Sequence, residues 1–124
     1  SNDSATAVTK GPLTVAKRFR AATGNASFGY FGGGNGVIST VDRIDYSNDT
    51  ATAVAKGPLS VSREGMGATG NASFGYFAGG YPSKSTIDRV DYSNDTATAS
   101  PKGPLIAANT YNSGNSAGAN ALPQ

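Results

Sequence analysis

The sequence predicts an all-β protein made of repeated, four-stranded antiparallel units. Ser-Asn-Asp recurs at Ser1, Ser47 and Ser93, which gives a period of 46 residues, and about 30 of the 46 positions agree between the first two copies. Each copy holds short segments rich in Val, Thr and aromatic residues between Gly, Asn, Asp and Pro turns, a pattern typical of strands. No segment shows the periodicity of a helix. The third copy follows the repeat to Leu105 and then diverges.

Four strands are expected in each copy. The first covers 20–24 and ends in a Gly-Asn turn pair. The second, at 28–31, is aromatic and leads into three glycines, whereas the third, at 40–46, alternates between its two faces. The fourth, at 50–54, follows an Asn-Asp turn and is rich in Thr. The Lys-Gly-Pro-Leu segment at 56–59 ends the unit, because Pro cannot donate to a ladder.

The composition supports thin sheets. Leu, Ile, Val and Phe make up about 16% of the chain, a share that elsewhere accompanies disorder. Disorder also needs a high net charge, whereas the formal net charge here is +2. The large apolar residues recur at fixed places in the repeat, between many Gly, Ala, Ser, Thr and Asn residues. We therefore expect sheets that complete their core by stacking on neighbouring repeats.

Missing residue types exclude several functions. The chain has no His and no Cys, which excludes nucleophile systems built on those residues and the ordinary zinc, copper and haem sites. We expect no enzyme, no cofactor and no metal. The small, spread positive charge argues against a nucleic-acid partner, and no apolar run reaches the length of a membrane span. Because the chain starts at Ser1 and not Met, we expect a processed product or a piece of a longer polypeptide.

A period of 46 residues lies within the range of four-stranded β-propeller blades, about 40–50 residues. The residues also resemble the kelch repeat, in which an apolar strand ends in a double glycine and a later strand carries a Tyr. The segments 28–33 and 74–80 look like the double-glycine strand, and Tyr46 and Tyr92 stand where the kelch Tyr stands. The resemblance covers about residues 1 to 105.

The loop between units carries the rest of the resemblance. The Gly-Pro-Leu segments at 11–13 and 57–59, followed by Lys17 and Arg63, resemble the Pro-containing kelch loop that leads to a basic residue. The sequence departs from the kelch pattern in one respect, because it lacks the Trp of the outer strand. Smaller residues must therefore pack at that place, and the unit would be a divergent one.

The resemblance implies a fold of kelch-like β-propeller blades. The repeats are also similar to kelch-type repeats in structural (virion) proteins of marine and cyanobacterial phages. This similarity implies a non-enzymatic structural or recognition module of a virion (phage tail or fibre) or extracellular assembly. The alternative is a carbohydrate-binding, lectin-like propeller with a glycan or host-surface ligand. Enzymes of the galactose-oxidase kind share the kelch fold, but their copper ligation and Cys cross-link are impossible in this sequence.

The repeat boundaries predict a partial propeller of about two blades. Residues 1–16 would hold the outer strand of an incomplete blade, an orphan strand near 4–8, and an inter-blade loop. Blade one is expected at 17–55, blade two at 63–101, and a degenerate tail or single strand at 102–124. A propeller needs about four blades or more to close. The expected partners are therefore copies of this chain or a larger polypeptide, in a closed ring or an open stack.

Differences between the two copies fall in two windows. One window is 16–21 against 62–67, and the other is 32–38 against 78–84. In a propeller blade both windows open on one face of the disc, and the constant loops open on the other. Variation on one face is expected if the loops there carry recognition. Neutral drift in exposed loops is the alternative.

The candidate binding residues lie in these windows. The basic cluster of the first copy could grip phosphate, sulfate or an acidic sugar, and a Tyr on a Gly-flanked loop of the second copy could stack on a sugar ring. Solvated loops and packing on the same blade are the alternatives. The full set is Lys17, Arg18, Phe19, Arg20, Asn35, Arg63, Glu64, Met66, Tyr81 and Lys84.

Three further motifs are interpreted as structural. Arg43 is expected to form an ion pair, with Asp45 on its own strand or with the next unit. The alternating oxygen side chains at 45–49 have the spacing of a calcium loop but lack its Gly and Glu, so a hydrogen-bonded turn is favoured. Asn in an Asn-x-Ser/Thr triplet is interpreted as a turn residue in preference to a glycosylation acceptor. The triplets begin at Asn2, Asn25, Asn48, Asn71 and Asn94.

Overall fold

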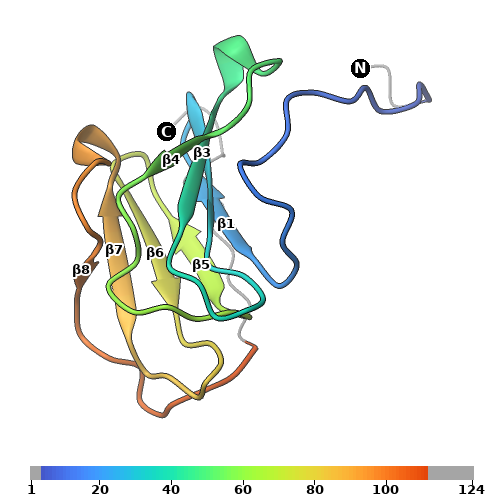
Figure 1. Ribbon diagram of the computed structural model, residues 1–124. Coiled ribbons are helices and arrows are strands. Elements are labelled where there is room, and N and C mark those ends of the chain that lie inside the picture. Colours follow the sequence, from blue (N-terminus) through green and yellow to red (C-terminus); the bar gives the residue numbers. More distant parts are fainter. Residues whose placement is uncertain (1–3, 112–124) are drawn as a thin grey trace.

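A computed structural model describes residues 4–111, which form two four-stranded antiparallel sheets (Figure 1). The first sheet contains β1 (Ala21–Gly24), β2 (Phe28–Gly32), β3 (Val41–Asp45) and β4 (Val54–Lys56), in that order. The second sheet contains β5 (Gly67–Gly70), β6 (Phe74–Ala78), β7 (Ile87–Asp91) and β8 (Ser100–Pro101), in that order. A 3-10 turn follows the third strand of each sheet, as η1 (Tyr46–Asn48) and η2 (Tyr92–Asn94).

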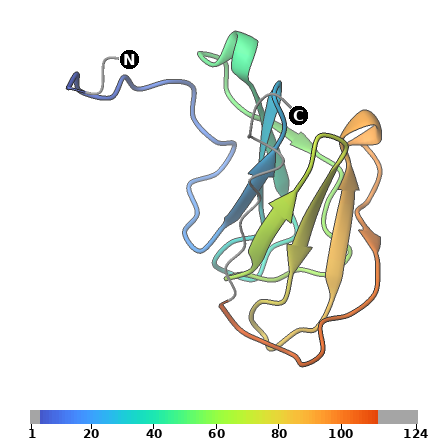
Figure 2. The ribbon, with the colours of Figure 1, turned by 180° about the vertical axis from the view of Figure 1, so that it is seen from behind.

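The two sheets repeat the same strand register. Tyr30 lies opposite Arg43 in the first sheet, and Tyr76 lies opposite Arg89 in the second, 46 residues later. The predicted all-β class and the four-stranded antiparallel unit are confirmed. The sheets pack face to face, with β1 next to β5, and do not close into a ring (Figure 2). Among the described residues, no helix has the length and apolar character needed to cross a membrane.

The fourth strand begins later than the sequence predicted. It was expected at 50–54, but β4 spans Val54–Lys56. The earlier backbone groups have other partners, because the Ala51 N–H donates to the Asn48 carbonyl and the Ala53 N–H donates to the Pro12 carbonyl. Pairing with β3 therefore starts only at Val54.

The expected orphan strand near 4–8 does not form. Residues 4–20 contain no strand, and the first part of this segment runs away from the sheets (Figures 1 and 2). A strand is stable only with a partner edge, and β3 of the first sheet is already occupied by β4 on its outer side. The expected tail begins after β8, and its residues 112–124 lie outside the described part of the chain.

The core lies between the two sheets. Tyr30 and Val41 of the first sheet and Phe77 of the second are fully buried. Tyr30 also stacks on Tyr92, with ring centroids 4.9 Å apart and an interplanar angle of 12°. Gly32 lets the sheets approach, because a Cβ at that position would lie 2.9 Å from Cε1 of Phe77. The few large side chains therefore make one shared core, as the low apolar content required.

Polar side chains close the turns. The Asp45 carboxylate accepts hydrogen bonds from the Ser47 N–H at 2.9 Å and the Ser47 hydroxyl at 2.6 Å, and these bonds lower the pKa of Asp45. Asp91 and Ser93 repeat the arrangement. The interpretation of 45–49 as a hydrogen-bonded turn is confirmed. The Asn25 side-chain oxygen likewise accepts two backbone N–H groups of its turn.

Candidate functional site

The variable windows of both copies gather at one end of the molecule, which we call the variable end. In the first copy the Arg18 N–H donates to the Asn35 side-chain oxygen at 3.0 Å, and the Asn35 N–H donates to the Arg18 carbonyl at 2.9 Å. In the second copy Glu64 and Tyr81 exchange backbone hydrogen bonds of 3.1 and 2.7 Å. The two windows of each copy are therefore adjacent, as the sequence predicted.

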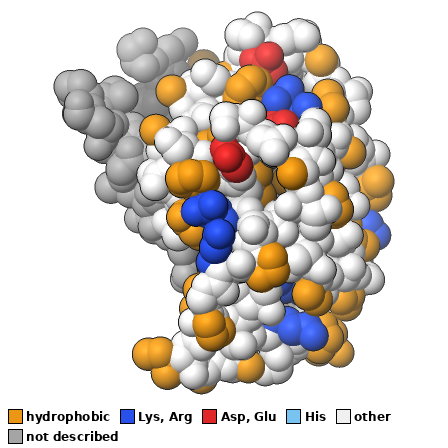
Figure 3. Space-filling model, turned by 90° about the vertical axis from the view of Figure 1, so that its left-hand side faces the viewer, with side chains coloured by type: hydrophobic (Ala, Val, Ile, Leu, Met, Phe, Trp, Pro, Cys, Tyr) orange, Lys and Arg blue, Asp and Glu red, His pale blue; other side chains and the backbone are white. Residues whose placement is uncertain are grey.

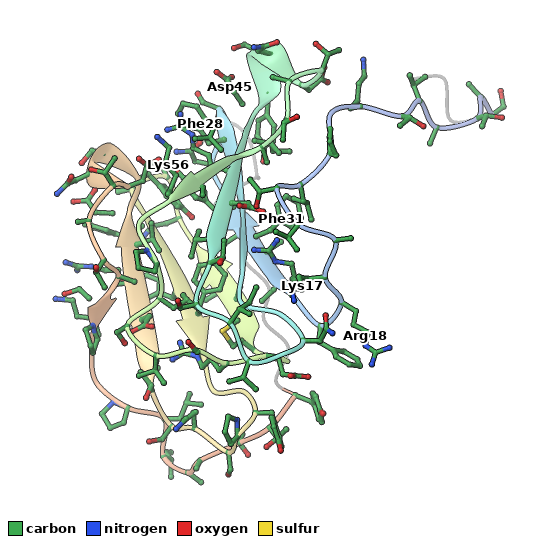
Figure 4. The ribbon with its side chains drawn as sticks, in the orientation of Figure 1. Lys17, Arg18, Phe28, Phe31, Asp45 and Lys56 are labelled. Atoms are coloured by element: carbon green, nitrogen blue, oxygen red, sulfur yellow. The ribbon has the colours of Figure 1, made fainter. Side chains whose placement is uncertain are left out.

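The constant loops lie at the opposite end. The Tyr46 N–H donates to the Ser27 carbonyl, which joins the two constant loops of the first copy. Figure 4 shows Lys17 and Arg18 at one end of the first sheet and Asp45 at the other. The separation of variable and constant loops onto two ends is thus confirmed, whereas ligand binding at the variable end stays a prediction.

The variable end carries exposed aromatic rings on an unusual backbone. The exposed fractions of Phe19, Tyr81 and Tyr111 are 48%, 48% and 62%. Phe19, Val37 and Tyr111 have left-handed φ values of 60°, 57° and 60°. Such a conformation costs a non-glycine residue about 1–3 kcal/mol and is enriched at functional sites. The Phe19 carbonyl also accepts the Gly65 N–H, which ties the two copies together at this end.

Three of the predicted binding residues lie in the interior. Arg63 is fully buried, Met66 is 4% exposed, and the Arg20 side chain is 5% exposed. The prediction that these three residues lie on an open binding surface is therefore wrong. The others are exposed or half-buried at the variable end, and these are Lys17, Arg18, Phe19, Asn35, Glu64, Tyr81 and Lys84.

Arg20 holds the loops of the first copy in place. Its Nη1 lies 3.0 Å from Oδ2 of the buried Asp42, and its Nη2 donates to the carbonyls of Phe31 and Thr40. The Thr14 hydroxyl also donates to Asp42. Because this carboxylate has no exposed surface, the guanidinium and the hydroxyl are what compensate its lost hydration.

Arg63 does the same work in the second copy. Its Nη2 lies 3.3 Å from Oδ2 of the buried Asp88 and donates to the Phe77 carbonyl at 2.9 Å. Burial lowers the pKa of Arg63, and the adjacent Asp88 opposes that shift. The Ser60 hydroxyl takes the place that Thr14 has in the first copy. Arg63, the basic residue after the second Gly-Pro-Leu segment, thus has a structural role, whereas in the first copy that role belongs to Arg20 and not to Lys17.

The carboxylate of Asp95 joins the two sheets. Its Oδ2 accepts the Tyr30 hydroxyl at 2.7 Å and Nη1 of Arg43 at 2.8 Å, and Nζ of Lys56 lies 3.6 Å from its Oδ1. The two donors and the lysine all come from the first sheet, whereas Asp95 follows η2 of the second. Burial and the adjacent Asp95 raise the pKa of the Tyr30 hydroxyl. Arg43 therefore pairs with the next unit, which was one of its two predicted partners.

Sequence reasoning missed Tyr30 and Asp95 as partners. The signal available was the invariance of both positions between the copies, since Tyr76 and Asp49 are their equivalents. A single repeat cannot show that its Tyr meets the Asp of the following repeat. That contact needs the packing of one sheet on the other.

A shallow hollow of about 430 Å³ lies at the constant end, away from the candidate residues. Phe28, Phe74 and Tyr92 supply its rings, and Asn25, Ser93 and Asp91 supply polar atoms. Its open shape and its single carboxylate do not form a catalytic constellation. Within residues 4–111, no group of three acidic side chains is placed to hold a metal ion.

The fold and these contacts define the class of the molecule, an all-β repeat protein in which two equivalent sheets pack face to face through a buried tyrosine–aspartate–arginine network. No protein-family model matches the chain, and no curated protein matches it.

Proposed function

We propose that this chain is a non-enzymatic repeat module whose sheets are kelch-like propeller blades, and that it builds a structural or recognition assembly of a virion or an extracellular particle. One observation carries the proposal. Residues that are buried in the interface between the two sheets have repeat equivalents on the two outer faces, and these equivalents are exposed or half-buried. Tyr92 is 8% exposed inside the interface, whereas its equivalent Tyr46 is 47% exposed. A module with two such faces gains stability by stacking on further units.

The charged groups support a structural role. Asp42, Asp88 and Asp95 each bind an arginine side chain and are buried or nearly so. Groups used in this way orient loops and sheets. The virion or extracellular setting rests on the kelch-like features of the repeat and on its similarity to phage structural proteins.

Light scattering after size-exclusion chromatography tests the module proposal. We expect a mass that is a multiple of 12.4 kDa and that falls on dilution. Arg18→Ala, at the variable end, is the matched control and should leave the mass unchanged. A mass of 12.4 kDa at every concentration would overturn the proposal.

Carbohydrate binding at the variable end is the second candidate function. The observation that favours it is the exposure of Phe19 and Tyr81, since aromatic rings stack on sugar faces. On a glycan array we expect binding that Phe19→Ala or Tyr81→Ala abolishes. Val54→Ala, an exposed apolar residue outside the variable windows, is the control that keeps it. An array without signal would remove this candidate and leave the module proposal in place.

A further inference from the structure

The two outer sheet faces are complementary halves of the internal interface. The outer side of the first sheet, here called the leading face, carries half-buried or exposed equivalents of buried interface residues of the second sheet. These are Phe31, Ile44, Tyr46 and Asp49, equivalent to Phe77, Val90, Tyr92 and Asp95. The outer side of the second sheet, the trailing face, carries the equivalents of Tyr30, Val41 and Arg43. These are Tyr76, Ile87 and Arg89, and none of them is fully buried.

Charge completes the match. Nζ of Lys10 lies 3.6 Å from Oδ1 of Asp49, as Nζ of Lys56 lies 3.6 Å from Oδ1 of Asp95. Oδ2 of Asp95 also accepts hydrogen bonds from the Tyr30 hydroxyl and from Arg43 of the same chain. Among the described residues, the charged group that approaches the Asp49 carboxylate is Lys10, and it lies at Oδ1. The position that Tyr76 and Arg89 of a trailing face would fill is therefore vacant on the leading face.

Arg89 is already oriented for this contact. Its guanidinium lies 4.2 Å from the centroid of the Phe74 ring, and Arg43 lies 4.2 Å from that of Phe28. The same stacking thus holds the arginine at the open face and at the closed one. Figure 3 views the side of the molecule on which β8 lies and shows Lys and Arg side chains set among hydrophobic ones.

An unpaired arm accompanies the leading face. Val8–Lys10 are equivalent to β4, but they form no strand, and Val8 is 74% exposed. The edge of β7 is occupied by β8, which pairs at two positions where β4 pairs at three. The arm reads Val-Thr-Lys, whereas β8 and the following residue read Ser-Pro-Lys. Val and Thr favour strands, and Pro disfavours them.

Exchange of the arm between two copies would also bring their leading and trailing faces together. Inside the chain, the residues after β4 pass onto the second sheet, where the Gly57 N–H donates to the Asp95 carbonyl. The residues after the arm make the same contact with the first sheet, since the Gly11 N–H donates to the Asp49 carbonyl. An arm that pairs with β7 of another molecule therefore brings its own leading face onto that trailing face.

We propose that this chain binds a second copy of itself head to tail, the leading face of one copy stacking on the trailing face of the other while its Val8–Lys10 arm replaces β8 on β7. Asp49 of one copy then accepts Tyr76 and Arg89 of the other. In that assembly β8 leaves β7, because the arm and β8 require the same edge. This inference rests on the module function proposed above and names its partner and its contacts.

A charge exchange tests the faces. Asp49→Arg places two arginines opposite each other, and Arg89→Asp places two aspartates there, so each variant alone should have a mass of 12.4 kDa. An equimolar mixture restores an opposite pair at every contact and should regain the wild-type mass. Glu64→Arg and Arg18→Asp make matched charge changes at the variable end and should assemble as the wild type does.

Proline substitutions test the arm. The Lys102 N–H donates to the Ile87 carbonyl, and hydrogen-bonded pairs alternate along an antiparallel ladder. In the exchanged pairing the Val8 N–H would therefore donate to β7, whereas the Thr9 N–H would point away from it. Thr9 would take the place of Pro101, which has no N–H to donate. Val8→Pro should weaken association about tenfold and Thr9→Pro should not. Ser100→Pro weakens β8 and should strengthen association to a similar extent.

The outcomes separate the two proposals. If the wild type assembles but the charge variants assemble as well, or their mixture stays at 12.4 kDa, head-to-tail pairing is overturned and the module function stands. If Val8→Pro and Thr9→Pro behave alike, the arm is not the exchanged strand. A wild type that is monomeric at all concentrations overturns the module function itself.

Discussion

Arg20 and Arg63 bind equivalent aspartates from positions that are not equivalent in the repeat. Arg20 reaches Asp42 and the Phe31 carbonyl, and Arg63 reaches Asp88 and the Phe77 carbonyl. The repeat equivalent of Arg20 is nevertheless Met66, and that of Arg63 is Lys17. Counted along the repeat, Arg63 lies three positions before the equivalent of Arg20. The two guanidinium groups nevertheless bind equivalent carboxylates. The long side chain makes this possible, because Arg can reach one carboxylate from two backbone positions.

This relationship predicts a rescue. Arg63→Met leaves Asp88 buried without its partner and should lower the free energy of unfolding by about 3 kcal/mol. Adding Met66→Arg recreates the arrangement of the first copy and should recover at least half of the loss. Urea unfolding of the single and double variants measures both values. A double variant no more stable than Arg63→Met would show that the two arginine positions are not interchangeable.

The Tyr30 hydroxyl should matter more than that of its repeat equivalent. Tyr30→Phe removes the buried hydrogen bond to Asp95 and should lower the free energy of unfolding by about 2 kcal/mol. Tyr76→Phe, on the trailing face, is the matched control and should change it little. Both are measured by urea unfolding in the Asp49→Arg background, in which the outer faces do not associate. Equal losses would contradict the assignment of the inter-sheet network.

Stability should fall at alkaline pH. The folded pKa of Tyr30 lies above its ordinary value of 10.0 because burial and Asp95 disfavour the phenolate. Above pH 10 the unfolded chain releases this proton while the folded chain retains it, so the free energy of unfolding decreases as pH rises. Below pH 10 the contribution is fully present. Urea unfolding from pH 8 to 11 should show the decrease, and Tyr30→Phe should reduce its slope. A slope that Tyr30→Phe leaves unchanged would assign the effect to other groups.

The turn aspartates should titrate low. Ser47 donates two hydrogen bonds to Asp45 and holds its pKa below the ordinary value of 3.8. Ser47→Ala removes the hydroxyl donor and should raise the pKa of Asp45 toward 3.8, and the pKa of Asp91 should not move. Carboxyl chemical shifts followed through an acid titration report each group separately. A pKa of Asp45 that Ser47→Ala leaves in place would mean that the backbone bond alone sets it.

The contact between Gly32 and Phe77 predicts the effect of a methyl group at two equivalent positions, on folding stability at Gly32 and on association at Ala78. Gly32→Ala puts a methyl group 2.9 Å from the Phe77 ring and should lower the free energy of unfolding by about 2 kcal/mol. Its equivalent Ala78 lies on the trailing face, where Phe31 of a second copy would meet that methyl group. Ala78→Gly should therefore leave folding nearly unchanged and tighten association. Thermal unfolding and sedimentation velocity measure the two effects. Weaker association of Ala78→Gly would argue against the stacked geometry.

Much of the local structure was predictable from residue type and repeat. The aromatic strand at Phe28, the Asn25 turn and the Asp45 turn form where the pattern placed them, because each depends on contacts within a few residues. The fourth strand was misplaced because a backbone hydrogen bond from Ala53 to Pro12, far away in sequence, holds the segment before Val54. The binding set was too large for a related reason, since a loop residue such as Arg63 can turn inward when a buried carboxylate lies behind it.

The sequence by itself determined a repeating, all-β chain without His or Cys chemistry, in which copies 46 residues apart adopt the same strands. Periodicity and turn residues act locally, so they can be followed along one chain. Only the tertiary structure decided which arginine meets which aspartate, and that the tyrosine of one repeat meets the Asp95 carboxylate of the next. These choices depend on how one sheet packs on another. The same packing leaves a leading and a trailing face open, which no single repeat could reveal.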